Sequence, residues 1–120
     1  MTTILIIEDA ESVRSMLTMR LKRAGYQVES AENGKVGVER ALGLRPEVVL
    51  MDLHMPVMDG HEAVRLLRTQ GYDGLIVAVT ASAMIDETSR STGRDCDAFI
   101  AKPIGKDFEE RIAGLLARRK

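Results

Sequence analysis

The chain has 120 residues, of which 45% are hydrophobic, and its formal net charge is -1. This length suits one globular domain with its own core and excludes a second full domain. The balance of 17 basic and 18 acidic residues disfavours a protein that chiefly coats nucleic acid or anionic lipid, because both roles need a basic excess.

The N-terminus gives no sign of a targeting segment. Only four aliphatic residues, Ile4–Ile7, precede Glu8, which is too short a run for a signal peptide or a membrane span. The single cysteine, Cys96, excludes an internal disulfide and favours a reducing compartment. We therefore expect a cytoplasmic protein that neither enters a membrane nor binds nucleic acid directly.

Short β-branched or aliphatic runs recur along the chain, starting roughly every 23 residues. We predict five strands from these runs: Ile4–Ile7, Gln27–Ala31, Val48–Met51, Leu75–Thr80 and Ala98–Ala101. Each interval has room for one strand, one helix and two turns, but is too long for a hairpin. The pattern predicts five βα units.

The composition of the strands predicts their order. Four of the runs are unbroken apolar stretches, as expected of parallel strands that helices cover on both faces. Gln27–Ala31 alternates polar and apolar residues instead, which favours a sheet edge. We predict an α/β, flavodoxin-like doubly wound (βα)5 fold with a parallel sheet in the order 2-1-3-4-5 and helices on both faces.

Between the strands, apolar residues at three- and four-residue spacing predict core-facing helices. Three such stripes are Val13, Met16, Leu17, Leu21 and Ala24, then Ala63, Val64 and Leu67, and finally Phe108, Ile112 and Leu115. Gly25 is the expected stop of the first helix. The stretch from Asp86 to Asp95 holds poor helix formers and almost no apolar stripe, so we expect a short, weakly held fourth helix there.

Residues that could form a reactive site end or follow four of the five predicted strands, whereas the edge strand contributes nothing chemically distinctive. They are Glu8 and Asp9, Asp52, Thr80 and Lys102. Each has an ordinary explanation, since Asp9 and Asp59 are good helix caps and most lysines are solvated. Because parallel strands end at one edge of a sheet, and ligands bind where the strand order reverses, we expect the five residues to converge on one crevice.

Three crowded carboxylates repel one another and need a cation among them. Oxygen ligands without a histidine or cysteine cage favour a hard divalent ion, and a site with few carboxylates suits Mg²⁺ better than Ca²⁺. His54 and His61 are expected to be ordinary surface residues rather than imidazole ligands.

These residues form a pattern that resembles a known family. The segment Asp52–Gly60 reads D-x-x-M-P-x-x-D-G, with Glu8–Asp9 upstream and Thr80–Ala81 and Lys102–Pro103 downstream. The set, in this order and at these intervals, resembles the receiver domains of two-component response regulators, which also occur in hybrid histidine kinases. The resemblance covers the whole chain, so residues 1–120 are expected to form a single receiver domain.

The resemblance implies that Asp52 accepts a phosphoryl group from a phosphohistidine of a histidine kinase or a phosphotransfer domain. It implies that Glu8, Asp9, Asp52 and the backbone carbonyl of His54 hold Mg²⁺. The chain would then be a switch that catalyses only its own phosphotransfer and dephosphorylation, not an enzyme acting on other molecules.

The resemblance also assigns the response to phosphorylation. Thr80, the backbone at Ala81 and Lys102 are expected to bind the phosphoryl oxygens, and Thr80 and the ring of Phe99 to move together. A downstream protein would bind the face formed by the fourth helix, the fifth strand and the fifth helix. The Lys102–Pro103 bond is a candidate cis peptide.

Other functions fit the sequence less well. A magnesium-dependent aspartyl-phosphate phosphatase of the haloacid dehalogenase type needs D-x-D after the first strand, where this chain has Glu8–Asp9–Ala10. A nucleotide- or flavin-binding module would need a glycine-rich loop, which Gly34–Lys35 does not provide. A degenerate receiver is disfavoured because every position needed for chemistry is filled. A receiver excised from a hybrid kinase or a larger regulator stays open.

Overall fold

The computed structural model describes residues 1–55, 58–81, 85 and 93–119. Five parallel strands form one sheet in the order β2-β1-β3-β4-β5, as predicted. In chain order the elements are β1 Thr3–Ile7, α1 Glu11–Arg23, β2 Gln27–Ala31, α2 Gly34–Leu44, β3 Val48–Asp52, α3 Gly60–Thr69, β4 Leu75–Ala81, β5 Ala98–Lys102 and α5 Phe108–Arg119. Among the helices described, none is long and apolar enough to span a membrane.

Two features of the sequence analysis fall on residues outside this description. The first is Pro56, which belongs to the D-x-x-M-P-x-x-D-G motif. The weak helix expected between Asp86 and Asp95 is the other, since it falls almost entirely outside the described residues.

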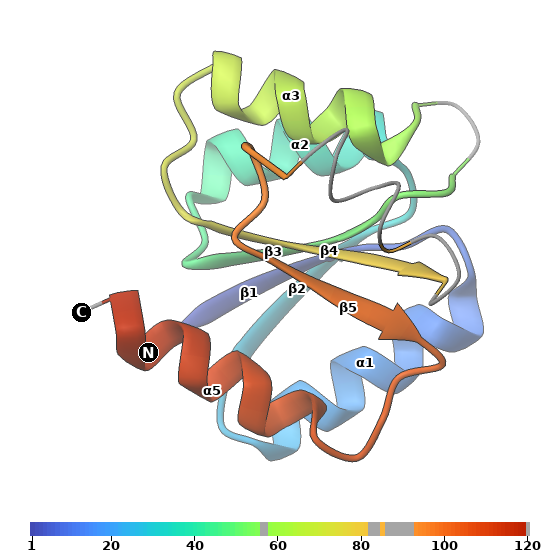
Figure 1. Ribbon diagram of the computed structural model, residues 1–120, viewed down its shortest axis with the longest axis vertical. Coiled ribbons are helices and arrows are strands. Elements are labelled where there is room, and N and C mark those ends of the chain that lie inside the picture. Colours follow the sequence, from blue (N-terminus) through green and yellow to red (C-terminus); the bar gives the residue numbers. More distant parts are fainter. Residues whose placement is uncertain (56–57, 82–84, 86–92, 120) are drawn as a thin grey trace.

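Helices cover both faces of the sheet, with α2 and α3 on one side and α1 and α5 on the other (Figure 1). The alternation of strand side chains divides the core accordingly. Leu5 and Ile7 of β1 join the cluster that contains buried side chains of α2 and α3, whereas Ile4 and Ile6 join the cluster with α1 and α5. All four are at most 1% exposed, which is why this strand reads as an unbroken apolar run.

The sequences of the two edge strands differ in how clearly they indicate an edge position. β2 lies at an edge as predicted, and only Val28 and Ala31 of its five residues are buried, one in each core cluster. β5 lies at the opposite edge although its first four residues are all apolar, and of its five residues only Ile100 is buried. The reason is that β5 has a neighbour, β4, on one side only.

A glycine after α1 and capping side chains at the N-termini of α2 and α3 mark the ends of these helices. α1 ends before Gly25, whose φ of 97° is a left-handed conformation that glycine adopts without strain. The α2 and α3 N-termini are capped by the side chains of Asn33 and Asp59, which accept from the N–H groups of Val36 and His61. Asp59 therefore has the ordinary capping role.

Candidate functional site

The expected polar residues lie together at the carboxyl edge of the sheet. The register pairs Ile7 of β1 with Met51 of β3, so the next residues, Glu8 and Asp52, leave the sheet side by side. Thr80 lies near the end of β4, and Lys102, the last residue of β5, pairs with Ala81. The topology thus brings groups from four strands to one place, as the sequence predicted.

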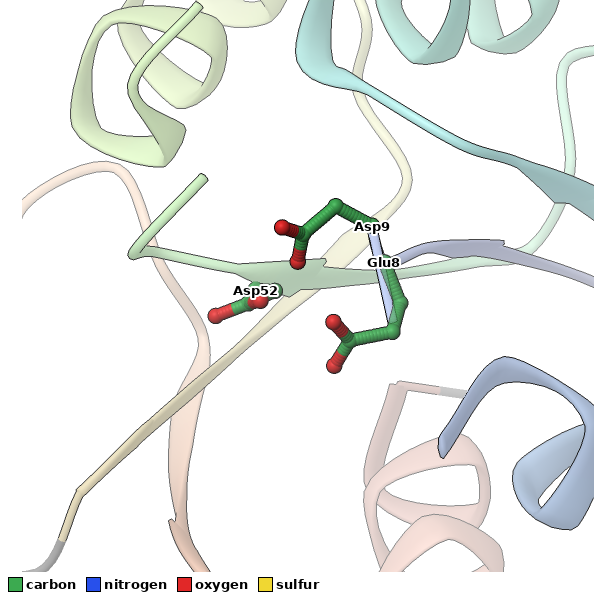
Figure 2. Close-up of side chains that lie close together, drawn as sticks. All are labelled: Glu8, Asp9 and Asp52. Carbon is green, nitrogen blue, oxygen red and sulfur yellow. The ribbon is translucent and has the colours of Figure 1, made fainter. Parts of the chain in front are cut away.

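Glu8, Asp9 and Asp52 form a cluster of carboxylates. One oxygen from each lies within 4.8 Å of the others, and the three side chains point into the same space (Figure 2). Glu8 and Asp52 are only 2% and 3% exposed, while Asp9 is exposed. Negative charges held this close with so little water require a positive partner.

Lys102 is one such partner. Its Nζ lies 3.0 Å from Oε1 of Glu8 and 3.4 Å from Oδ2 of Asp52. Partial burial alone lowers the pKa of Lys102, but the hydrogen bond to Glu8 and the charges of Asp52 and Glu8 outweigh it and raise the pKa above its ordinary value of 10.5. The ammonium therefore stays charged at neutral pH beside the two buried carboxylates.

The backbone around the acidic pair is fixed from α1. Nη1 of Arg14 donates to the carbonyl oxygens of Glu8, at 2.8 Å, and Asp9, at 3.4 Å. Oε2 of Glu8 accepts from the N–H of Ala10, the N-cap residue of α1, whose own side chain makes no cap. The carboxylate of Asp9 is not the cap of α1, so the ordinary explanation of this residue does not hold.

Asp52 is held from the other side by the segment that follows it. Its Oδ1 accepts from the N–H of His54 at 3.1 Å. A Cβ added to Gly60 would collide with the carbonyl oxygen of Asp52 and with Cα of Leu53. Only glycine lets the start of α3 pack this closely against the backbone after β3, which explains the glycine that ends the motif.

Thr80 has a partner that sequence reasoning missed. Its side chain is fully buried, and its Oγ1 lies 3.1 Å from Nε2 of His54. The sequence led us to expect His54 as an ordinary surface residue, and it is exposed, but its ring contacts a buried hydroxyl. The register contained the signal, since Asp52 pairs with Val79, the residue before Thr80.

Arg14 is the second residue that sequence reasoning missed. A basic side chain on the first turns of the helix after an acidic loop is a signal, but many such residues are merely solvated.

Two further expectations concern the end of β5 and the residue Phe99. The Lys102–Pro103 bond is cis, as predicted. Phe99 is half-buried and pairs with Ala78, two residues before Thr80.

In chemical terms, the site consists of the buried Asp52 carboxylate, the neighbouring carboxylates of Glu8 and Asp9, and the ammonium of Lys102. The donor set, three carboxylates without histidine or cysteine, suits a hard divalent ion such as Mg²⁺. The Asp52 carboxylate is fixed by a backbone N–H and an ammonium, which favours it over an unrestrained surface aspartate as a nucleophile.

Comparisons with known proteins agree with this site. Residues 4–112 match the response regulator receiver domain family. The chain is 38% identical over 122 residues to the two-component response regulator ORR41 of Oryza sativa, covering 98% of this chain and 94% of that protein. It is 34% identical over 118 residues to the response regulator MprA of Mycobacterium leprae, but covers only 52% of that protein's length.

A solved structure is also similar. The response regulator TrrA of Thermotoga maritima, crystallised in complex with Mg²⁺-BeF, superposes with a TM-score of 0.83 at 25% identity, over 96% of this chain and 99% of that one. Sequence, fold and the acidic cluster at the carboxyl edge thus lead to the same family. The chain belongs to the receiver domains of two-component response regulators.

Proposed function

We propose that Asp52 accepts a phosphoryl group from a phosphohistidine of a histidine kinase or phosphotransfer domain, in a Mg²⁺-dependent reaction. The observation that carries the proposal is the environment of this carboxylate, which is 3% exposed, lies close to the carboxylates of the acidic pair and is 3.4 Å from the ammonium of Lys102. The family acts in two-component signalling as a phosphoacceptor switch rather than as a metabolic enzyme.

The transfer exchanges one bond to phosphorus for another. The Asp52 carboxylate attacks phosphorus while the P–N bond of the donor breaks, and the donor imidazole leaves as it takes up a proton. Asp52 becomes an acyl phosphate. Its carboxylate is aligned beforehand by the His54 N–H, and the ammonium of Lys102 offsets the charge of the incoming phosphoryl oxygens.

Glu8, Asp9 and Asp52, with the backbone carbonyl of His54, would hold the magnesium ion. When bound, Mg²⁺ supplies positive charge against the phosphoryl oxygens. Arg14 supports this set indirectly, because its guanidinium fixes the backbone of both Glu8 and Asp9.

The phosphoryl group would be bound by Lys102, by the Thr80 hydroxyl and by the backbone N–H of Ala81. Ala81 is small and exposed, which leaves the donor a path to Asp52. We assign the switch to Thr80 and Phe99, whose ring packs against the core cluster on the α2 and α3 side. The chain catalyses its own phosphotransfer and dephosphorylation and no other reaction.

The downstream protein is proposed to bind the face of the fourth helix, β5 and α5. Its described part includes a groove of about 520 Å³ along β5 and α5, lined by Ala98, Arg111 and Leu115 among others. Residues 1–120 would act as one receiver domain. The cytoplasm is the proposed location, which agrees with a chain that has one cysteine, Cys96, and so no internal disulfide.

The proposal is tested with phosphoramidate, a small donor with a P–N bond, and Mg²⁺. Intact mass should show one lasting phosphoryl group that is lost in base, and chelation of Mg²⁺ should prevent it. Asp52→Asn should abolish the mass gain, and its matched control is Asp59→Asn, a change at a neighbouring aspartate that caps α3 and can be replaced by another good cap. Steady release of phosphate without a lasting mass gain would instead indicate a phosphatase.

A further inference from the structure

The hydrogen bond between His54 and Thr80 joins two residues that the phosphorylated site would use differently. We propose that His54 is a positioning residue: its imidazole holds the Thr80 hydroxyl in the unphosphorylated protein and competes with the phosphoryl group for it. The inference rests on the proposed function of Asp52. It adds a side chain role to a residue that otherwise contributes only its backbone.

The geometry of the pair supports this role. Nε2 of His54 lies 3.1 Å from Oγ1 of Thr80, whose side chain is fully buried although His54 is exposed. A buried hydroxyl is costly to leave without a partner, so the contact stabilises one position of Thr80. If the Thr80 hydroxyl donates its proton to Nε2, it must give up this hydrogen bond before it can donate to a phosphoryl oxygen on Asp52.

His54 is restrained well enough to hold its partner. The preceding residue, Leu53, is fully buried, donates its N–H to Val79 at 3.1 Å and accepts from Gly60 at 3.3 Å. The ring of His61 meets the His54 ring edge-on, with centroids 6.3 Å apart. The imidazole therefore projects from fixed backbone and has a ring neighbour beside it.

The same residue also touches the phosphoacceptor. The N–H of His54 donates to Oδ1 of Asp52 at 3.1 Å, while its side chain reaches Thr80. One residue therefore links the carboxylate that would be phosphorylated to the hydroxyl that would respond.

The competition takes one of two forms, depending on the tautomer of His54. Phosphoryl oxygens only accept hydrogen bonds, and a threonine hydroxyl has one proton to donate. With Nε2 unprotonated, the hydroxyl gives that proton to His54 and has none for the phosphoryl group. With Nε2 protonated, the imidazole donates to Oγ1 and holds the oxygen on the His54 side. Either tautomer favours the resting position.

The test compares three side chains at position 54 in the full chain. His54→Leu keeps bulk but cannot hydrogen-bond, and His54→Gln keeps a polar group close to the place of Nε2. Beryllium fluoride, a phosphoryl analogue, is titrated at fixed Mg²⁺ while the NMR signal of the Thr80 methyl group reports the change. His54→Leu should lower the half-saturating concentration by about two- to tenfold, and His54→Gln should stay within about twofold of the native protein.

The Thr80→Val variant, with and without His54→Leu, tests whether the effect depends on the Thr80 hydroxyl. In a Thr80→Val background, read from the signals of neighbouring methyl groups, the effect of His54→Leu should vanish, because the hydroxyl that His54 holds is gone. An unchanged affinity in His54→Leu, an effect that persists in the Thr80→Val background, or a His54→Gln that behaves like His54→Leu would each overturn the inference. Failure of the native protein to bind beryllium fluoride, or binding that survives Asp52→Asn, would instead overturn the proposed function.

Discussion

At the scale of single residues, the site is a balance between burial and charge. Glu8 and Asp52 are almost fully buried carboxylates, and the single ammonium of Lys102 serves both. With Asp9 close by, three carboxylates share the one ammonium that forms ion pairs with them among the described residues, so repulsion remains in the metal-free fold. A divalent ion relieves this repulsion, which couples metal binding to stability.

Magnesium is therefore expected to raise the melting temperature. At an Mg²⁺ concentration ten times the Kd, binding adds about 1.4 kcal/mol, which corresponds to a rise of about 6 °C for a domain of this size. Asp9→Asn should stabilise the metal-free protein by removing one repelling charge, and should blunt the magnesium response. Differential scanning calorimetry with and without millimolar Mg²⁺ measures both effects. Asp59→Asn is the control, and a full response in Asp9→Asn would remove Asp9 from the site.

At the scale of elements, α1 and α5 are joined next to the connection that follows Lys102, the last residue of β5. Arg20 of α1 pairs through Nε with Glu109 of α5 at 2.8 Å and donates to the carbonyl oxygen of Gly105. Its guanidinium also lies 5.3 Å from the centre of the Phe108 ring. This contact fixes the connection from β5 to α5 and thereby supports the position of Lys102.

The pair makes a small contribution to stability that depends on pH. The hydrogen bond to Arg20 lowers the pKa of Glu109 below its ordinary value of 4.5. The pair therefore contributes its full stabilisation at pH values above the ordinary pKa of 4.5. This stabilisation is lost as the pH falls through the lowered pKa of Glu109. Because Glu109 is 33% exposed, Glu109→Gln should reduce the unfolding free energy by only about 0.5–1 kcal/mol at pH 7.

Urea denaturation at several pH values tests this expectation. The difference between the native protein and Glu109→Gln should be constant near neutral pH and should shrink as the pH falls below about 4. Glu110→Gln, a change at the next residue, is the matched control, since Glu110 forms no ion pair among the described residues. A difference that grows in acid would show that another group is responsible.

The switch also belongs to the element scale, because β4 and β5 would respond together. Thr80→Ala keeps the nucleophile and should still accept the phosphoryl group, but should fail to transmit the change to β5. NMR shifts of Phe99, measured before and after phosphorylation, report the transmission. Equal shifts of Phe99 in the native protein and in Thr80→Ala would contradict the role given to the hydroxyl.

At the scale of the whole molecule, most of the fold could be predicted because βα units repeat locally. The apolar runs predicted all five strands and the alternation in Gln27–Ala31 predicted an edge, and both are confirmed. The convergence of the polar residues followed from parallel strands alone. The sequence could not predict how little of β5 is buried, because its apolar composition resembles that of a central strand.

The contacts that sequence reasoning missed all depend on neighbours far apart in the chain or on backbone atoms. Arg14 does not stand out because the carbonyl groups that it binds leave no mark in the sequence. The contact of His54 with Thr80, and that of Arg20 with Glu109, each join separate elements. Such pairs become visible only once the register and the helix placement are known.

The central claim, that Asp52 is the residue that becomes phosphorylated, is tested most directly by locating the modification. The protein is incubated with Mg²⁺ and acetyl phosphate, reduced with borohydride, which converts an aspartyl phosphate to homoserine, and digested for peptide mass spectrometry. We expect homoserine at position 52 and nowhere else, and none after chelation of Mg²⁺. Homoserine at Asp9 or Asp59, or no homoserine under conditions that label another receiver domain, would contradict the account.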